Sequence, residues 1–150
     1  MKFLVLHGPN LNLLGTREPE IYGKQTLEEL NSEIQDLAQS LGHELRIEQH
    51  NIEGSLVESV QKAAHDCQGI LINPGAYTHT SVALRDALIA IDLPTIEVHL
   101  SVPMAREDFR QINLIADVVT GRVEGFGPSS YLLALRALDS HAAGNNLKPG

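Results

Sequence analysis

Two residues near the end of a short apolar segment have the types and spacing of a general acid and its partner. Glu97 and His99 lie two positions apart in the segment 95–100, and alternate residues of a β-strand point to one face. A carboxylate beside an imidazole fixes the orientation of the ring and favours its protonated form. The pair therefore predicts a proton donor, although a histidine at a strand end is more often simply hydrogen-bonded.

A metal site is a less favoured interpretation of the same region. Its ligands would come from four residues, His7, His79, Glu97 and His99. The sequence has no closely spaced pair such as His-x-x-x-His or Cys-x-x-Cys, which usually marks a metal site. The residue pattern therefore favours proton transfer over metal binding.

A candidate general base lies in the 18-residue stretch 8–25, which shows no clean periodicity. It contains Arg17 and Tyr22, and a guanidinium within about 4–6 Å of a phenol lowers the pKa of that phenol from about 10. Loops longer than about 12–15 residues are usually lids or binding loops. A partly helical structural excursion is the alternative, and an arginine and a tyrosine in one loop are a weak signal alone.

Two further segments are candidates for anion binding. Residues 73–81 are rich in turn formers and hydroxyls and precede a helix, whose free N–H groups favour an anion. The alternative is a turn whose hydroxyls only cap that helix. Arg106 and Arg110 are four apart, so on a helix they would share a face and could clamp a carboxylate. A solvated basic face is equally consistent with this spacing.

The composition limits the classes of partner. The formal net charge is −8, with 11 Lys and Arg against 19 Asp and Glu, which opposes binding to nucleic acid and to anionic membranes. Aromatic residues make up 4% of the chain, too few for a base-stacking platform. No apolar run approaches the ~20 residues of a membrane span. We therefore expect no nucleic-acid and no membrane partner.

Other chemistries have no signal in the sequence. Cys67 is the single cysteine, which excludes an internal disulfide and favours a reduced, structural thiol in a cytoplasmic protein. The phosphate-binding, dinucleotide-binding and nucleophile-elbow motifs are absent. None of the four lysines, Lys2, Lys24, Lys62 and Lys148, ends an apolar strand, so a Schiff-base lysine is not expected.

The elements that must position these residues alternate between strand and helix. Apolar runs and alternation predict strands at 2–7, 44–48, 69–73, 95–100 and 117–123. Helical spacing predicts helices at 26–41, 55–67, 81–91 and 128–138, the first two opened by capping boxes at Thr26 and Ser55. Residues 142–150 are expected to be a frayed tail.

This alternation predicts one α/β domain spanning residues 1–150. We expect a flavodoxin-like, doubly wound, five-stranded parallel sheet with strand order 2-1-3-4-5. In that order the first, third and fourth strands are neighbours, and ligands bind at the carboxyl ends of such strands. The polar residues that follow residues 7, 73 and 99 should therefore converge on one crevice.

Taken together, the motifs resemble one family over roughly residues 3–138. The segments 7–15 (HGPNLNLLG), 17–19 (REP) and 22–23 (YG) are similar to the opening of type II 3-dehydroquinate dehydratases. The segment 73–86 (NPGAYTHTSVALRD) resembles the central motif of that family. The segments 97–101 (EVHLS) and 105–110 (AREDFR) resemble its third motif. The order and spacing of three long motifs make this resemblance specific.

The resemblance implies dehydration of 3-dehydroquinate to 3-dehydroshikimate, the third step of the shikimate pathway. It implies an anti elimination through an enolate, without metal, cofactor or imine. The implied catalytic residues are Tyr22 as base, Arg17 beside it, His99 as acid, Glu97 orienting the acid, and Asn10 holding a water near the enolate. The implied substrate-binding residues are Asn73, His79, Asp86, Leu100, Ser101 and Arg110. The family forms trimers and dodecamers, and Asp86 is expected to reach a neighbouring subunit's site.

Two short segments depart from the family pattern. Val102-Pro103-Met104 stands where relatives commonly carry Asn-Val-His, and 111–114 (QINL) where they often carry His-His-Ser-Tyr. Pro103 lacks a backbone donor and has a fixed φ. We expect these departures to affect the carboxylate pocket and subunit contacts, and to leave the acid, base and enolate groups untouched. The alternative function is a flavodoxin-like module that binds a small molecule without turnover, which rests on the fold alone.

Overall fold

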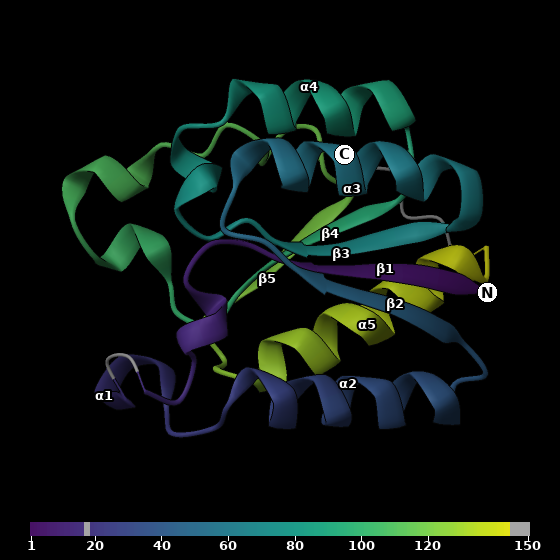
Figure 1. The fold of residues 1–150 in the computed structure, drawn as a ribbon, viewed down its shortest axis with the longest axis horizontal. Helices are drawn as coiled ribbons and strands as arrows, with labels where there is room; N and C mark the ends of the chain where they lie inside the picture. The colour runs from purple at the N-terminus through teal and green to yellow at the C-terminus, as the bar shows by residue number, and fades with distance from the viewer. Residues whose placement is uncertain (17–18, 145–150) are drawn as a thin grey trace.

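The computed structural model describes residues 1–16 and 19–144, except for the side chains of residues 21 and 22. Five parallel strands form one sheet: β1 (Lys2–His7), β2 (Glu44–Gln49), β3 (Gly69–Asn73), β4 (Thr95–His99) and β5 (Gly121–Glu124). Their order is β2-β1-β3-β4-β5, which confirms the predicted topology. The helices α2 (Leu27–Ser40) and α5 (Ser129–Ala142) cover one face, and α3 (Glu53–Asp66) and α4 (Val82–Ile91) cover the other (Figure 1).

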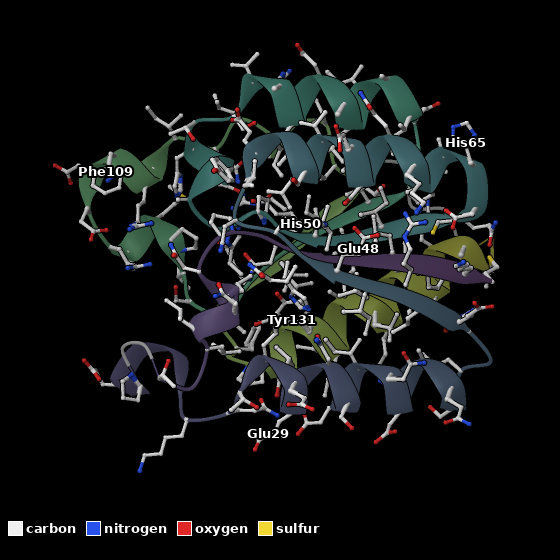
Figure 2. All side chains as sticks on the ribbon, in the orientation of Figure 1. Glu29, Glu48, His50, His65, Phe109 and Tyr131 are labelled. Atoms are coloured by element: carbon white, nitrogen blue, oxygen red, sulfur yellow. The ribbon has the colours of Figure 1, made fainter. Side chains whose placement is uncertain are left out.

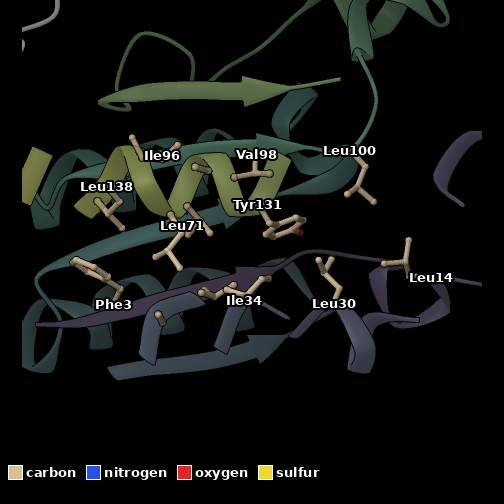
Figure 3. Packing of buried hydrophobic residues seen from close by; sticks show 14 residues of the cluster. Phe3, Leu14, Leu30, Ile34, Leu71, Ile96, Val98, Leu100, Tyr131 and Leu138 are labelled. Atoms are coloured by element: carbon tan, nitrogen blue, oxygen red, sulfur yellow. The ribbon is translucent and has the colours of Figure 1, made fainter. Parts of the chain in front are cut away.

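Two apolar clusters hold the helices to the sheet. On the face of α2 and α5, Val5 and Leu71 pack with Tyr131 and are fully buried (Figure 3). On the opposite face, Leu6 and Ile72 pack with helices α3 and α4. This alternation along β1 and β3 follows from the two-residue period of a strand, and the continuous apolar sequence reflects cover on both faces.

The predicted capping box at Thr26 is confirmed and the one at Ser55 is wrong. The Thr26 hydroxyl accepts from the Glu29 N–H at 3.2 Å, and the Glu29 carboxylate accepts from the Thr26 N–H at 3.2 Å. Helix α3 instead begins at Glu53, with Ile52 as its N-cap. The Leu56 N–H already bonds the Ile52 carbonyl at 3.2 Å, so Ser55 lies inside the first turn.

Two predicted boundaries near the C-terminus are also corrected. The strand expected at 117–123 is β5, at Gly121–Glu124. Residues 118 and 119 belong to a turn, because both their N–H groups bond the Ile115 carbonyl. Helix α5 continues to Ala142, so the tail does not begin there. Of the rest of the predicted tail, residues 143 and 144 follow the helix as its C-cap and a turn, and residues 145–150 lie outside the described residues.

The segments that follow β1, β3 and β4 gather at one end of the sheet, on the left in Figure 1. After β1 come the 3-10 helix η1 (Leu11–Leu13) and the short helix α1 (Pro19–Tyr22), so the long loop is partly helical. After β3 comes η2 (Gly75–His79), and after β4 come η3 (Pro103–Ala105) and η4 (Asp108–Gln111). Arg106 follows η3 and Arg110 lies in η4; the two arginines therefore do not share one helix.

Close backbone packing joins the first two of these segments. The Gly8 N–H donates to the Asn73 carbonyl at 2.7 Å. A Cβ on Gly8 would lie 2.6 Å from the backbone of Pro74, so only glycine fits there without displacing the chain. This contact fixes the start of the long loop against the segment after β3. Within the described residues, no helix has the length and apolar character needed to cross a membrane.

Candidate active site

A cavity opens at the carboxyl ends of β1, β3 and β4. Seven of the residues predicted for the site line it: Asn10, Asn73, His79, His99, Leu100, Ser101 and Arg110. Arg106 and Pro103 line it as well. The parallel topology explains this convergence, because neighbouring strands end at one edge of the sheet. The predicted crevice is therefore present and contains most of the predicted residues.

Glu97 and His99 form the pair that their spacing predicts. Nε2 of His99 lies 2.6 Å from Oε1 of Glu97. The Glu97 side chain is fully buried, and His99 is 6% exposed and reaches the cavity wall. A buried carboxylate that accepts from one ring nitrogen fixes the tautomer and leaves the other nitrogen for a ligand. The arrangement can therefore deliver a proton from His99 into the cavity.

Three side chains from distant parts of the chain complete the surroundings of Glu97. The Thr78 hydroxyl donates to Oε1 at 2.9 Å, Asn113 Nδ2 to Oε1 at 2.9 Å and Oε2 at 3.1 Å, and Arg122 Nε lies 3.1 Å from Oε2. Burial alone would raise the pKa of Glu97. The hydrogen bond and charge of His99, with Thr78 and Arg122, outweigh burial and hold that pKa below its usual value.

The contact from Asn113 corrects one expectation. The departure at 111–114 was expected to leave the acid, base and enolate groups untouched, but Asn113 lies in it and touches the partner of the acid. Its Oδ1 accepts from the N–H groups of Ile115 and Ala116, both at 2.9 Å. This turn fixes the amide and aims its nitrogen at Glu97. The sequence holds a weak signal for it, an asparagine directly before an apolar segment.

A buried polar chain supports Asn73 from behind the cavity. Nδ1 of His7 lies 2.9 Å from the hydroxyl of Tyr131, and Nε2 lies 2.7 Å from Oδ1 of Asn31. Tyr131 projects from α5 toward the sheet (Figure 2). Burial raises its pKa, and a side-chain hydrogen bond from Asn73 opposes that shift. The Asn73 amide is thus oriented from the protein side, and its Oδ1 accepts from the Gly75 N–H at 3.1 Å.

Because His7 is buried, the free energy of unfolding should depend on pH below neutrality. Burial lowers the pKa of His7 from 6.5 to about 4, against a smaller opposing effect of Asn31. As pH falls below 6.5, the unfolded chain takes up a proton that the folded chain excludes until about pH 4. The native state should lose roughly 3 kcal/mol over this interval from His7 alone.

Urea denaturation at a series of pH values between 7 and 4 tests this. The His7→Gln variant should lose less stability across the interval than the original chain. The control is His65→Gln, an exposed position on α3 (Figure 2), which should follow the original chain. Equal pH dependence in His7→Gln and the original chain would contradict the prediction.

Amide side chains from the end of β2 hold the first cavity loop. Asn10 has a left-handed backbone, with φ of 69°, and its N–H donates to Oδ1 of Asn51 at 3.0 Å. The Gln49 amide donates to the Gly8 carbonyl at 3.1 Å and to Oδ1 of Asn51 at 3.1 Å. Neither Gln49 nor Asn51 was predicted. The sequence could have indicated them, because both follow the strand predicted at 44–48, which neighbours the first strand in the expected sheet.

The cavity also holds positive charge in an acidic chain. Arg110 lines the cavity while its Nε donates to Glu107, and that ion pair lowers the pKa of the Glu107 carboxyl. On the cavity wall after β3, Nδ1 of His79 donates to the Ile112 carbonyl at 2.5 Å. Together with Arg106, these groups suit a small anion bearing hydroxyls.

Comparison with known proteins agrees with this geometry. Residues 1–139 match the sequence model of the family described as "Dehydroquinase class II". A 3-dehydroquinate dehydratase of Geotalea daltonii is 57% identical over 141 residues, which cover 94% of this chain and 98% of that protein. One from a Nostoc species is 56% identical over 144 residues, covering 96% and 98%. The crystal structure of the type II dehydroquinase from Butyrivibrio crossotus is similar at a TM-score of 0.91 and 43% identity, covering 93% and 98%.

The chain belongs to the class II dehydroquinase family. Two of the residues assigned through the dehydroquinase resemblance cannot be placed relative to the cavity. Arg17 lies outside the described residues. The backbone of Tyr22 ends α1, but its side chain is not among the described ones. Asp86 is exposed on α4 and does not line the cavity of its own chain.

Two other features of this dehydroquinase chain concern alternative chemistries. Burial raises the pKa of the Cys67 thiol to about 11, with a further contribution from Asp66, so the thiol stays protonated near neutral pH, in line with a structural role. Among residues 1–16 and 19–144, no group of three His, Cys, Asp or Glu side chains is arranged to hold a metal ion.

Proposed function

We propose that this chain dehydrates 3-dehydroquinate to 3-dehydroshikimate by anti elimination through an enolate, in the shikimate pathway. The observation that supports this most is the His99–Glu97 pair. A buried carboxylate orients an imidazole at the wall of a cavity, and that cavity also contains arginine and amide groups suited to a hydroxylated carboxylate. The membership of the chain in the dehydroquinase family supplies the substrate class.

Elimination next to a ketone needs a base, an acid on the opposite face and stabilisation of the enolate. In the proposed sequence, the Tyr22 phenolate removes the C2 proton while Arg17 lowers the pKa of that phenol. The electrons of the C–H bond form the enolate, near a water held by Asn10. The enolate then expels the hydroxyl group. The oxygen of that hydroxyl takes a proton from His99 as the C–O bond breaks, and water leaves. A proton returns from Tyr22 to His99 through solvent, which restores both groups.

The remaining cavity residues would bind the substrate. Arg110 would pair with its carboxylate, together with the backbone at Leu100 and Ser101. Asn73 and His79 would bind its hydroxyls. General acid–base groups typically contribute about 10²–10⁴-fold each, and fixed donors at the enolate must supply much of the rest.

The proposal extends to the assembly and location of the protein. Asp86 would contribute to the site of a neighbouring subunit, in trimers that build a dodecamer. Its exposed position on α4, away from the cavity of its own chain, is compatible with such a contact. We place the enzyme in the cytoplasm, acting without metal or cofactor.

Ultraviolet absorbance tests the proposed reaction directly. The product contains a conjugated enone that absorbs strongly, whereas the substrate does not. Purified protein mixed with 3-dehydroquinate should therefore give rising absorbance. Borohydride added with substrate should not inactivate the protein, because no imine forms. A flat trace from well-folded protein would favour the non-catalytic binding module instead, and inactivation with a lysine adduct would point to a Schiff-base dehydratase.

A further inference from the structure

The carboxylate behind the proposed acid has a cation on its far side. Oε1 of Glu97 accepts from His99 at 2.6 Å, and Oε2 lies 3.1 Å from Nε of Arg122. Glu97 and Arg122 are register partners on the adjacent strands β4 and β5. Arg122 therefore approaches from the neighbouring strand, and its side chain keeps 30% of its surface exposed. A cation, a carboxylate and an imidazole thus lie in sequence from the sheet edge to the cavity.

Hydrogen bonding alone does not explain this arrangement. Oε2 of Glu97 also accepts from Asn113 Nδ2 at 3.1 Å, and Oε1 accepts from Thr78 and Asn113, both at 2.9 Å. A carboxylate has about four acceptor positions, so neutral donors already serve both oxygens. What Arg122 adds to a fully buried carboxylate is positive charge.

That charge affects the group on the other side of Glu97. An ionised carboxylate favours the protonated form of a neighbouring imidazole, and a cation on the same carboxylate offsets part of that effect. A less stabilised imidazolium gives up its proton more readily. The charge of Arg122 should therefore make His99 a stronger acid without touching the substrate.

We propose that Arg122 is a positioning residue that sets the acidity of His99 through the buried carboxylate of Glu97. The proposal rests on the proposed function for its catalytic consequence, and on the Arg122–Glu97–His99 geometry for its electrostatic one. Arg122 would act together with Asn113. The neutral amide of Asn113 holds the Glu97 carboxylate in place, and the Arg122 guanidinium offsets part of the effect of that carboxylate on His99.

Other charged groups also face the Arg122–Glu97–His99 cluster and contribute to the electrostatic potential at His99. Glu124, on the same strand as Arg122, accepts from the Arg122 guanidinium at 2.9 Å and offsets part of its charge. On the cavity side of His99, the wall includes His79, Arg106 and Arg110. These groups stay unchanged when only residue 122 is substituted, so a comparison of variants isolates the effect of Arg122.

The test compares three variants. Arg122→Met removes the charge and the donors, Arg122→Lys keeps the charge, and Arg136→Met removes one positive charge from an exposed position on α5. The first readout is an NMR titration of the His99 imidazole, which needs no turnover. The second is the pH profile of kcat with 3-dehydroquinate.

In Arg122→Met, we expect His99 to titrate about half a pH unit higher or more. The limb on which kcat falls with rising pH should move with it, and maximal kcat should fall several-fold while KM changes little. In Arg122→Lys, the His99 titration and the kcat profile should both lie close to those of the original chain. Arg136→Met should match the original chain in both readouts. Should Arg122→Met fail to fold, Arg122→Gln makes the same comparison, since it keeps a donor but no charge.

An unchanged or lowered titration of His99 in folded Arg122→Met or Arg122→Gln would overturn the proposal. A loss of thermal stability with no shift of either pH readout would assign Arg122 a purely structural role and would also overturn it. Absence of dehydration in the original chain would instead refute the proposed function, while the NMR titration would still decide the electrostatic role of Arg122.

Discussion

Replacing His99 with glutamine should lower kcat for dehydration by about 10²–10⁴-fold while the protein stays folded. Glutamine has a similar length and keeps an amide donor for Glu97, so the buried carboxylate retains a partner. It cannot supply a proton to the departing hydroxyl. The loss should therefore appear in kcat, and KM should change little, because the interaction is made mainly as the C–O bond breaks.

Absorbance assays, with circular dichroism as the test of folding, measure this. The matched control is His65→Gln, which changes an exposed histidine at the end of the molecule opposite Phe109 (Figure 2) and should keep full activity. If folded His99→Gln retained activity within about threefold of the original chain, His99 would not be the proton donor. The His99–Glu97 pair would then be a structural contact.

The sequence pattern predicted the boundaries of those elements that are fixed by residues close to them in the chain. The continuous apolar run 2–7 lies between an exposed start and the segment His7-Gly8-Pro9, and β1 has those limits. The capping box at Thr26 was recoverable because its two hydrogen bonds join residues three apart. The strand order followed from the alternation of strands and helices, which leaves few ways to cover both faces of a parallel sheet.

The errors occurred where a turn just upstream, and in one case a buried residue within it, decided between local alternatives. Ser55 and Glu58 have the spacing of a capping box, but the chain leaving β2 already turns at Ile52, which is the N-cap, and the helix begins at Glu53. Residues 117–120 have a strand-like composition. Ile115 is fully buried against the face of α3 and α4, and its carbonyl holds the following residues in a turn.

The same reasoning applies to the candidate site. Glu97 and His99 could be paired from the sequence because they are two apart in one strand. The partners Thr78, Asn113 and Arg122 come from positions 19, 16 and 25 residues from Glu97, and only the register of β4 with β5 places Arg122 there. Periodicity within a single segment carries no information about such register.

The second large effect is expected for Tyr22→Phe, which should abolish detectable turnover or lower kcat by at least about 10²–10⁴-fold. Phenylalanine keeps the ring and removes only the oxygen that would accept the C2 proton. The backbone of Tyr22 ends α1, in the loop that follows β1 and at the same end of the molecule as the cavity segments (Figure 1). Binding of the product should therefore survive the substitution.

Calorimetric titration with 3-dehydroshikimate, alongside the absorbance assay, separates binding from turnover in this variant. The matched control is Tyr77→Phe, which also removes one phenolic oxygen, in this case one that donates to the Asn51 carbonyl at 2.9 Å. It should lose far less activity, since among the described residues the Tyr77 hydroxyl bonds only this backbone carbonyl. A Tyr22→Phe protein that keeps most of its kcat would remove Tyr22 from the role of base. If Tyr22→Phe lost product binding together with turnover, Tyr22 would instead be a residue that holds the substrate. An oxygen needed only to remove the C2 proton contributes nothing to the affinity for the product, because the product has already lost that proton.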